Sequence, residues 1–255
     1  MDYEIKQDGD YQYIEEGDGT VLLLLHGLFG ALSNFKGVIK HFSKKYKVIV
    51  PLLPIFSLPV FNTDIANLSN FVHDFIKFKN YHNIILLGNS LGGHVVLVYT
   101  SKHPENIHSI VLTGSSGLYE NTFGDGYPRK GDKNYLKEKI KITFYDPKHA
   151  TDSLVDECFE IVNDRHKLIR TLAFAKSAIR HNMADELPNI QVPACLIWGR
   201  DDKITPPKVA EEFKSLLPNA DLFWLDKCGH APMMELPDEF NAILDKWLGK
   251  LFGSI

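Results

Sequence analysis

Ser90 lies at the centre of the stretch Gly-Asn-Ser-Leu-Gly at residues 88–92, which has the spacing G-x-S-x-G and is followed by one more glycine. The apolar run before it, residues 83–87, is typical of a buried parallel strand, and residues 91–99 can form a helix. A serine at a tight turn between a strand and a helix is held above the edge of the sheet, with its hydroxyl exposed. We therefore interpret Ser90 as a nucleophile, with an ordinary glycine-rich turn as the alternative for the pattern taken alone.

A serine at its free pKa is a poor nucleophile, so it needs a base, and the base needs an orienting acid. The loop after the apolar run 194–198 contains two aspartates, Asp201 and Asp202, and the loop after the run 220–225 contains His230. The carboxyl ends of parallel strands meet at one edge of a sheet, which is where the serine is expected. The chain order Ser…Asp…His is one in which such triads occur. These two loops therefore offer a base, His230, and an acid, one of the two aspartates.

The elements that must position these residues form an alternating pattern. Short apolar runs predict strands at residues 21–25, 47–50, 83–87, 107–112, 193–198 and 220–225. Amphipathic stretches predict helices at residues 33–44 (with Ser33 as N-cap), 65–78, 91–99 (with Val95, Val96 and Tyr99 on its apolar side), 207–217 and 237–248. Residues 2–16 predict a β-hairpin that turns at residues 8–10. The fold class is therefore α/β, with an open, mostly parallel sheet.

Residues 118–189 interrupt this alternation, because they contain no run typical of a central strand. They are charged and predict three helices, at residues 132–142, 153–163 and 164–181. We therefore expect a core made of residues 1–117 and 190–255 with a helical insertion between two strands.

Taken together, four motifs resemble those of the α/β-hydrolase superfamily, and they cover nearly the whole chain. They are His26-Gly27 after the first central strand, G-x-S-x-G-G at residues 88–93, G-x-x-D-x-x-x-P at residues 199–206, and Gly229-His230 followed by Glu235 and Pro237. The resemblance implies an α/β-hydrolase fold with a Ser-His-Asp triad that needs no cofactor.

The aspartate of the third motif, G-x-x-D-x-x-x-P, is Asp202 in this chain, so the resemblance makes Asp202 the acid of this triad. Asp201 is then a solvated neighbour or a turn residue, and Asp226, on the end of a strand, is expected to face solvent. The resemblance also implies that His26 braces its loop and takes no part in the chemistry.

An oxyanion hole needs two backbone N–H donors that point at the developing negative charge. One is expected from Leu91, the residue after the nucleophile. By resemblance, the second comes from Leu28, with Phe29 as a lesser candidate.

The resemblance further implies that residues 118–189 fold over the nucleophile as a cap, which would exclude water and shape a pocket. Aromatic residues of this segment either line an apolar pocket or form the core of the cap, and we favour the core: Tyr127, Phe144, Tyr145, Phe159 and Phe174. Its cations either bind a substrate carboxylate or form a solvated helix face, and we favour the face: Arg165, Arg170, Lys176 and Arg180.

Within the superfamily, the chain resembles capped carboxylesterases and the C–C hydrolases that act on products of aromatic ring fission. Ala231 stands where the second group usually has tryptophan. The loop 51–59 has Leu52, Ile55 and Ser57 where relatives usually have an aspartate and two glycines, which suggests an apolar ligand or a contact with the cap or a partner. The leading hypothesis is hydrolysis of a small, apolar carboxylic ester through an acyl-enzyme on Ser90. Hydrolysis of a C–C bond in a ring-fission dienoate and a ligand receptor built on this fold are the alternatives.

Composition and charge narrow the classes of partner, cofactor and cellular compartment that we expect for this chain. The formal net charge of the 255 residues is −4, which gives no reason to expect nucleic acid as a partner. The apolar run 21–25 is too short to span a bilayer, and the first four residues lack the features of a signal peptide. Three scattered cysteines, Cys158, Cys195 and Cys228, match neither a disulfide framework nor a metal site. We expect a cytoplasmic protein without metal or cofactor, and the sequence does not indicate its oligomeric state.

Overall fold

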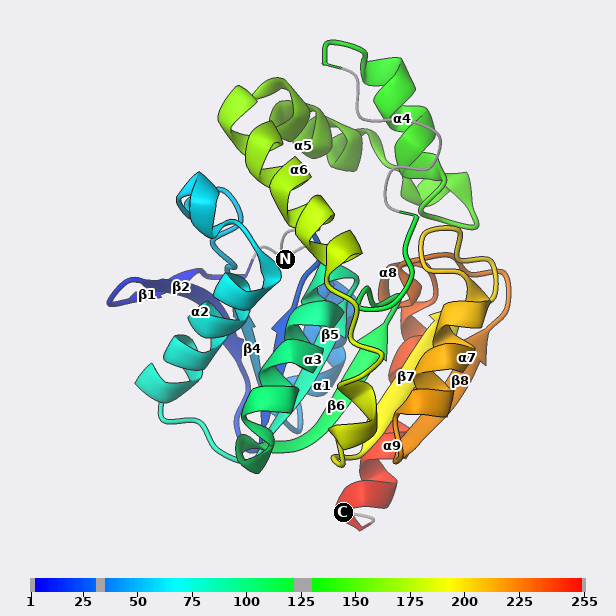
Figure 1. Cartoon of the computed structure of the whole chain (residues 1–255). Coiled ribbons are helices and arrows are strands. Elements are labelled where there is room, and N and C mark those ends of the chain that lie inside the picture. Colours follow the sequence, from blue (N-terminus) through cyan, green and yellow to red (C-terminus); the bar gives the residue numbers. More distant parts are fainter. Residues whose placement is uncertain (1–2, 31–34, 122–129, 254–255) are drawn as a thin grey trace.

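The computed structural model describes residues 3–30, 35–121 and 130–253. These residues form one eight-stranded sheet with the strand order β1-β2-β4-β3-β5-β6-β7-β8 (Figure 1). The strands are β1 (Lys6–Asp8), β2 (Tyr11–Glu16), β3 (Val21–Leu25), β4 (Lys47–Pro51), β5 (Ile84–Asn89), β6 (Ile107–Thr113), β7 (Ala194–Gly199) and β8 (Ala220–Leu225).

Strands β3 to β8 are parallel, whereas β1 and β2 form an antiparallel hairpin that joins the sheet through β4. Every residue of β3, β5 and β7 is buried. Strands buried on both faces explain why these segments are continuous apolar runs without alternation. The α/β class and the N-terminal hairpin are confirmed.

Helices cover both faces of the sheet (Figure 1). One face packs against α2 (Ile65–Phe78), α3 (Leu91–Lys102) and α7 (Pro207–Leu216). The other packs against α1 (Lys36–Phe42), α8 (Pro232–Glu235) and α9 (Pro237–Phe252). The predicted N-cap Ser33 lies outside the described residues, and α1 is described from Lys36.

Two helices differ from their sequence-based descriptions. The buried surface of α3 is wider than the single apolar side expected from the sequence, because every residue from Leu91 to Thr100 is buried. Helix α3 packs on the sheet and on α2, so it has no solvated face. Helix α9 continues to Phe252 and not to 248, with Trp247 and Leu248 still buried on the sheet.

In the described residues, three α-helices lie between β6 and β7 in the chain, above the carboxyl edge of the sheet (Figure 1). They are α4 (Lys133–Lys141), α5 (Asp152–Asn163) and α6 (Arg165–Arg180). Side-chain caps start them: Asp132 accepts the N–H of Tyr135, Thr151 that of Leu154, and Asp164 those of His166 and Lys167. The two ends of this segment meet, since Met183 donates its N–H to the carbonyl of Gly117 at 2.7 Å.

Candidate active site

Ser90 occupies the turn between β5 and α3 in a backbone conformation that L-residues rarely adopt, with φ 54° and ψ −121°. Such a conformation costs on the order of 1–3 kcal/mol and persists only where the surroundings impose it. Here Ser90 donates its N–H to Thr113 O at 3.2 Å and accepts the N–H of Ser116 at 3.2 Å. The turn is therefore held from β6 and the loop that follows it.

The loop after β3 lies directly against this serine. A Cβ placed on Gly27 would be 3.2 Å from Ser90 Cβ, so the close approach needs a glycine there. Leu28 follows immediately, and Leu91 is the first residue of α3, whose N–H has no partner within the helix. Both amides expected for the oxyanion hole thus come from segments that flank Ser90.

His26 is buried beside these donors and braces the loop. Its Nδ1 lies 2.9 Å from Gly27 O, and its Nε2 is 3.4 Å from the N–H of Leu53, which it accepts. Burial lowers the pKa of His26. A neutral ring that joins two loops fits the bracing role expected from the sequence.

Asp202 and His230 are in direct contact although they follow different strands. Asp202 Oδ2 lies 2.9 Å from His230 Nδ1, and only 3% of the aspartate and 6% of the histidine are exposed. An ionised carboxylate can only accept, so the proton of this bond is on Nδ1 and Nε2 of the neutral ring is the acceptor. Thr205 holds the carboxylate in place, because its hydroxyl donates to Oδ2 at 2.8 Å and its N–H to Oδ1 at 2.9 Å.

The electrostatics of His230 follow from this pair. Burial lowers the pKa of His230, but the charge of Asp202 and its hydrogen bond raise it by more, so the pKa lies above its ordinary value of 6.5. A charged partner thus stabilises the imidazolium that forms when the ring accepts a proton.

Hydrogen bonds at the carboxyl ends of β5 and β6 connect the turn of Ser90 with the loop of His230. Asn89 donates through Nδ2 to Thr113 O at 2.9 Å and to His230 O at 3.2 Å. A Cβ on Gly114 would be 2.9 Å from His230 Nδ1, so this ring lies on the same short segment that accepts the N–H of Ser90. In the described part of the chain, no hydrogen bond joins the Ser90 hydroxyl to the His230 ring; such bonds often tighten only when substrate is bound.

The two other aspartates of these loops point away from the histidine. Asp201 is exposed. Asp226 is also exposed and forms an ion pair with Arg200 Nε at 2.7 Å. Asp202 is thus the one of the three that contacts His230.

Glu235 is a buried carboxylate to which sequence reasoning assigned no role. Its Oε1 accepts the N–H of Gly229 at 2.7 Å, and its Oε2 accepts the N–H of Tyr145 at 2.8 Å. It therefore joins the loop of His230 to the segment that follows α4. The signal in the sequence that could have identified Glu235 is its position five residues after the histidine, at the start of an apolar helical pattern.

The aromatic side chains of the insertion differ in their surroundings. Phe174 and Phe144 are buried in the two large cores of the protein. Phe159 packs on a small cluster formed by Leu136, Cys158 and Val162, which Phe29 of the β3 loop also contacts. Tyr145 is 47% exposed, and Tyr127 lies outside the described residues.

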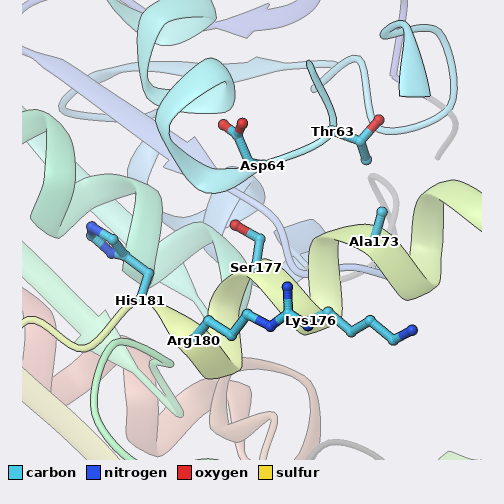
Figure 2. Close-up of a pocket in the computed structure, with 7 residues that line it drawn as sticks. All are labelled: Thr63, Asp64, Ala173, Lys176, Ser177, Arg180 and His181. Atoms are coloured by element: carbon cyan, nitrogen blue, oxygen red, sulfur yellow. The ribbon is translucent and has the colours of Figure 1, made fainter. Parts of the chain in front are cut away.

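The cations of α6 differ in their surroundings. Arg170 donates through Nε to Leu58 O at 2.7 Å, so the loop after β4 contacts the insertion, one of the three possibilities that its composition suggested. Lys176 and Arg180 line an open groove of about 490 Å³ between α6 and the start of α2 (Figure 2).

Two further features concern residues 3–30, 35–121 and 130–253. No helix there is long and apolar enough to cross a bilayer. No group of three or more His, Cys, Asp or Glu side chains in the same ranges could hold a metal ion.

Comparison with known proteins gives a consistent result. The model of a family described as "Alpha/beta hydrolase family" matches residues 22–243. A crystal structure of MGS-MChE2, an alpha/beta hydrolase enzyme from the metagenome of sediments of the Mar Chica lagoon in Morocco, is 47% identical, with a TM-score of 0.81 over 97% of this chain and 98% of that one.

Two curated relatives are more distant and have different activities in their names. A 2-hydroxy-6-oxo-6-(2'-aminophenyl)hexa-2,4-dienoic acid hydrolase of Metapseudomonas resinovorans is 28% identical over 91% of this chain and 86% of its own length. Lipase 1 of Psychrobacter immobilis is 26% identical over 96% of this chain and 86% of its own length.

Proposed function

The chain belongs to the alpha/beta hydrolase family, and from this membership we propose that it hydrolyses a small carboxylic ester through an acyl-enzyme on Ser90. The observation that carries the proposal is the 2.9 Å hydrogen bond between Asp202 and His230, located beside a serine with a strained backbone. A nucleophile, a base and an acid that orients the base are the parts that acyl transfer needs.

In the proposed first half-reaction, Ser90 Oγ attacks the ester carbonyl carbon while His230 Nε2 takes the hydroxyl proton. The carbonyl oxygen becomes an oxyanion, which the N–H groups of Leu28 and Leu91 stabilise. As the oxyanion collapses, the C–O bond to the alcohol breaks and His230 returns the proton to the leaving alkoxide. Asp202 keeps the imidazole in the required tautomer and stabilises its charged form.

In the second half-reaction, His230 takes a proton from a water molecule, and the resulting hydroxide attacks the acyl carbon. Collapse of the second tetrahedral intermediate releases the carboxylic acid and returns the proton to Ser90 Oγ. No step needs a metal or a cofactor, because all four proton transfers use one histidine and the negative charge is stabilised by backbone amides.

We further propose that residues 118–189 serve as a cap on this site, between core segments 1–117 and 190–255. Two contacts support this assignment. Phe29, next to the proposed oxyanion donor Leu28, packs on the helical cluster, and Glu235 joins the loop of His230 to Tyr145. A cover of this kind excludes water and strengthens the electrostatic interactions inside.

The direct test is hydrolysis of a series of p-nitrophenyl esters of increasing acyl length by the wild type and by Ser90→Ala. We expect the wild type to hydrolyse them and the variant to lose several orders of magnitude in kcat. Equal rates in both proteins would overturn the proposal.

A second candidate function is hydrolysis of a C–C bond in a ring-fission dienoate. The relative from Metapseudomonas resinovorans, which is named for that reaction and aligned over most of both chains, favours it. Against it stands the small, buried Ala231 after the histidine, where that group usually has tryptophan. Turnover of such a dienoate at a rate comparable with the best ester, and its loss in Ser90→Ala, would move the assignment to this class.

A further inference from the structure

Helix α6 is strongly basic in a chain whose net charge is negative. Its cations are Arg165, Lys167, Arg170, Lys176 and Arg180, and it contains no Asp or Glu, whereas the whole chain has 32 acidic residues against 28 Lys and Arg. Within the described residues, no ion pair involves any of these five side chains. By contrast, Lys133 and Lys137 of α4 pair with Asp156 and Asp152 of α5. The positive charge of α6 is therefore available to a partner.

An apolar ridge lies beside this helix. It is formed by Val60 and Phe61 on the short 3₁₀ helix η2 (Val60–Asn62), and 84% of Phe61 is exposed. Residues 58–65, which contain this ridge, run alongside α6, because Arg170 donates to Leu58 O at 2.7 Å and Ile65 donates its N–H to Ser177 Oγ at 3.1 Å. Val60 and Phe61 thus lie along α6 between the levels of these two bonds.

The open groove of about 490 Å³ lies between α6 and the start of α2, which directly follows the ridge in the chain (Figure 2). Lys176, Arg180 and His181 line it from the side of α6, and Thr63 and Asp64 from the start of α2. The carboxylate of Asp64 is already engaged, since it accepts the N–H of Asn67 and caps α2. The lining of the groove therefore carries an excess of positive charge, and the exposed apolar ridge ends at Phe61, two residues before Thr63.

Val60 and Phe61 are neighbouring exposed apolar side chains, and exposed apolar patches rimmed by polar residues mark sites of interaction with proteins or membranes. Cations next to an exposed apolar side chain are typical of elements that lie in the interface of an anionic bilayer, with rings among the acyl chains and Lys or Arg at the headgroups. An apolar peptide would account for Phe61 but not for the unpaired cations.

We propose that Val60, Phe61 and Ile169, together with Arg165, Lys176 and Arg180, form a docking surface for anionic lipid. Ile169 belongs to it because it lies on the same outward side of α6 as Lys176 and Arg180 and is 40% exposed. In this arrangement Phe61 inserts at the level of the headgroups and the cations contact lipid phosphates. The surface is separate from Ser90, so the proposal goes beyond ester hydrolysis and does not depend on it.

The test is co-sedimentation of the protein with vesicles, performed on wild type and on Ser90→Ala so that catalysis plays no part. We expect binding to vesicles of phosphatidylcholine mixed with phosphatidylglycerol, weak or no binding to pure phosphatidylcholine, and release by salt. Each cation near a charged bilayer contributes about 1 kcal/mol, so the pair Lys176→Gln and Arg180→Gln should weaken binding about 30-fold. Phe61→Ser should weaken it as well.

Matched controls lie away from this surface. Phe78→Ser replaces a half-exposed phenylalanine at the last turn of α2, and the pair Lys246→Gln and Lys250→Gln removes two charges from α9. Both should bind vesicles like the wild type, and all variants should keep the wild-type thermal unfolding. Binding that is equal in wild type and the docking-surface variants, or absent in wild type, would overturn the proposal. So would a dimer in lipid-free solution that Phe61→Ser dissociates, because the ridge would then belong to a second copy.

Discussion

The backbone N–H of His230 donates to the carbonyl of Thr143 at 2.8 Å. Thr143 follows α4 in the insertion, whereas His230 follows β8 in the core. The proposed base is therefore held from two sides, by Asp202 through its ring and by the insertion through its backbone. A shift of the insertion would move His230 relative to Ser90. The segment that is proposed to cover the site therefore also helps to position its base.

The first prediction concerns the acid of the triad. Asp202→Asn should lower kcat for the ester by about four orders of magnitude, because an amide at this position favours the wrong tautomer of His230. Asp201→Asn is the matched control, since Asp201 is adjacent but exposed, and it should retain nearly full activity. Steady-state kinetics of both variants check this, and similar losses in the two would remove Asp202 from its proposed role.

The second prediction is the pH dependence of the wild type. The reaction needs neutral His230, so kcat/KM for the ester should rise with pH as this histidine loses its proton. Because Asp202 places the pKa of His230 above 6.5, the midpoint of this rise should lie above that value. A midpoint clearly below 6.5 in a pH–rate profile would contradict the charge interaction between the two side chains.

The third prediction concerns Glu235. Glu235→Gln places an amide N–H₂ group opposite a backbone N–H, at Gly229 or at Tyr145, so one hydrogen bond is lost at a cost of about 1–3 kcal/mol in stability. The charge of Glu235 also contributes to the raised pKa of His230, so the midpoint of the pH–rate profile should move to lower pH in the variant.

The shift in the pH profile separates a positioning role from a purely structural one. A structural defect alone would lower the melting temperature and the amount of active protein without moving the midpoint. Glu239→Gln, an exposed acid on the first turn of α9, is the control and should change neither quantity.

The fourth prediction concerns the buried His94 and its half-buried partner His181, where the insertion returns to the core. His94 Nε2 lies 2.9 Å from His181 Nδ1, and burial, together with the neighbouring His181, lowers the pKa of His94 to about 3. In the unfolded chain His94 binds a proton near 6.5, so stability should fall as the pH drops from 6.5 toward 3. This one group contributes a slope of about 1.4 kcal/mol per pH unit over that window.

Urea unfolding at several acidic pH values measures this slope. His94→Gln should remove its share of the slope while costing stability at neutral pH, because a buried hydrogen bond is changed. The exposed His82→Gln serves as control and should leave the slope unchanged. An identical slope in wild type and His94→Gln would show that His94 is not the group that titrates.

Local patterns in the sequence were sufficient to predict the strands, the helices and the turn at Ser90. The apolar runs of β3, β5 and β7 identify buried parallel strands, and helix α2 begins and ends where its periodicity predicts, at residues 65 and 78. The spacing around Ser90 identifies a strand-to-helix turn, because only a few residue types permit its backbone geometry. These features depend on neighbours within a few positions, so a single sequence contains them.

Tertiary structure alone decided how distant segments meet. It brought Glu235 into contact with Tyr145, and it placed Phe61 beside the basic face of α6, although nothing near either residue in the sequence marks these partners. It also buried α3 on all sides, since a helix acquires a solvated face only from what packs around it. Contacts of this kind are set by the packing of whole elements, and the local spacing of residue types that defines strands, helices and turns does not encode them.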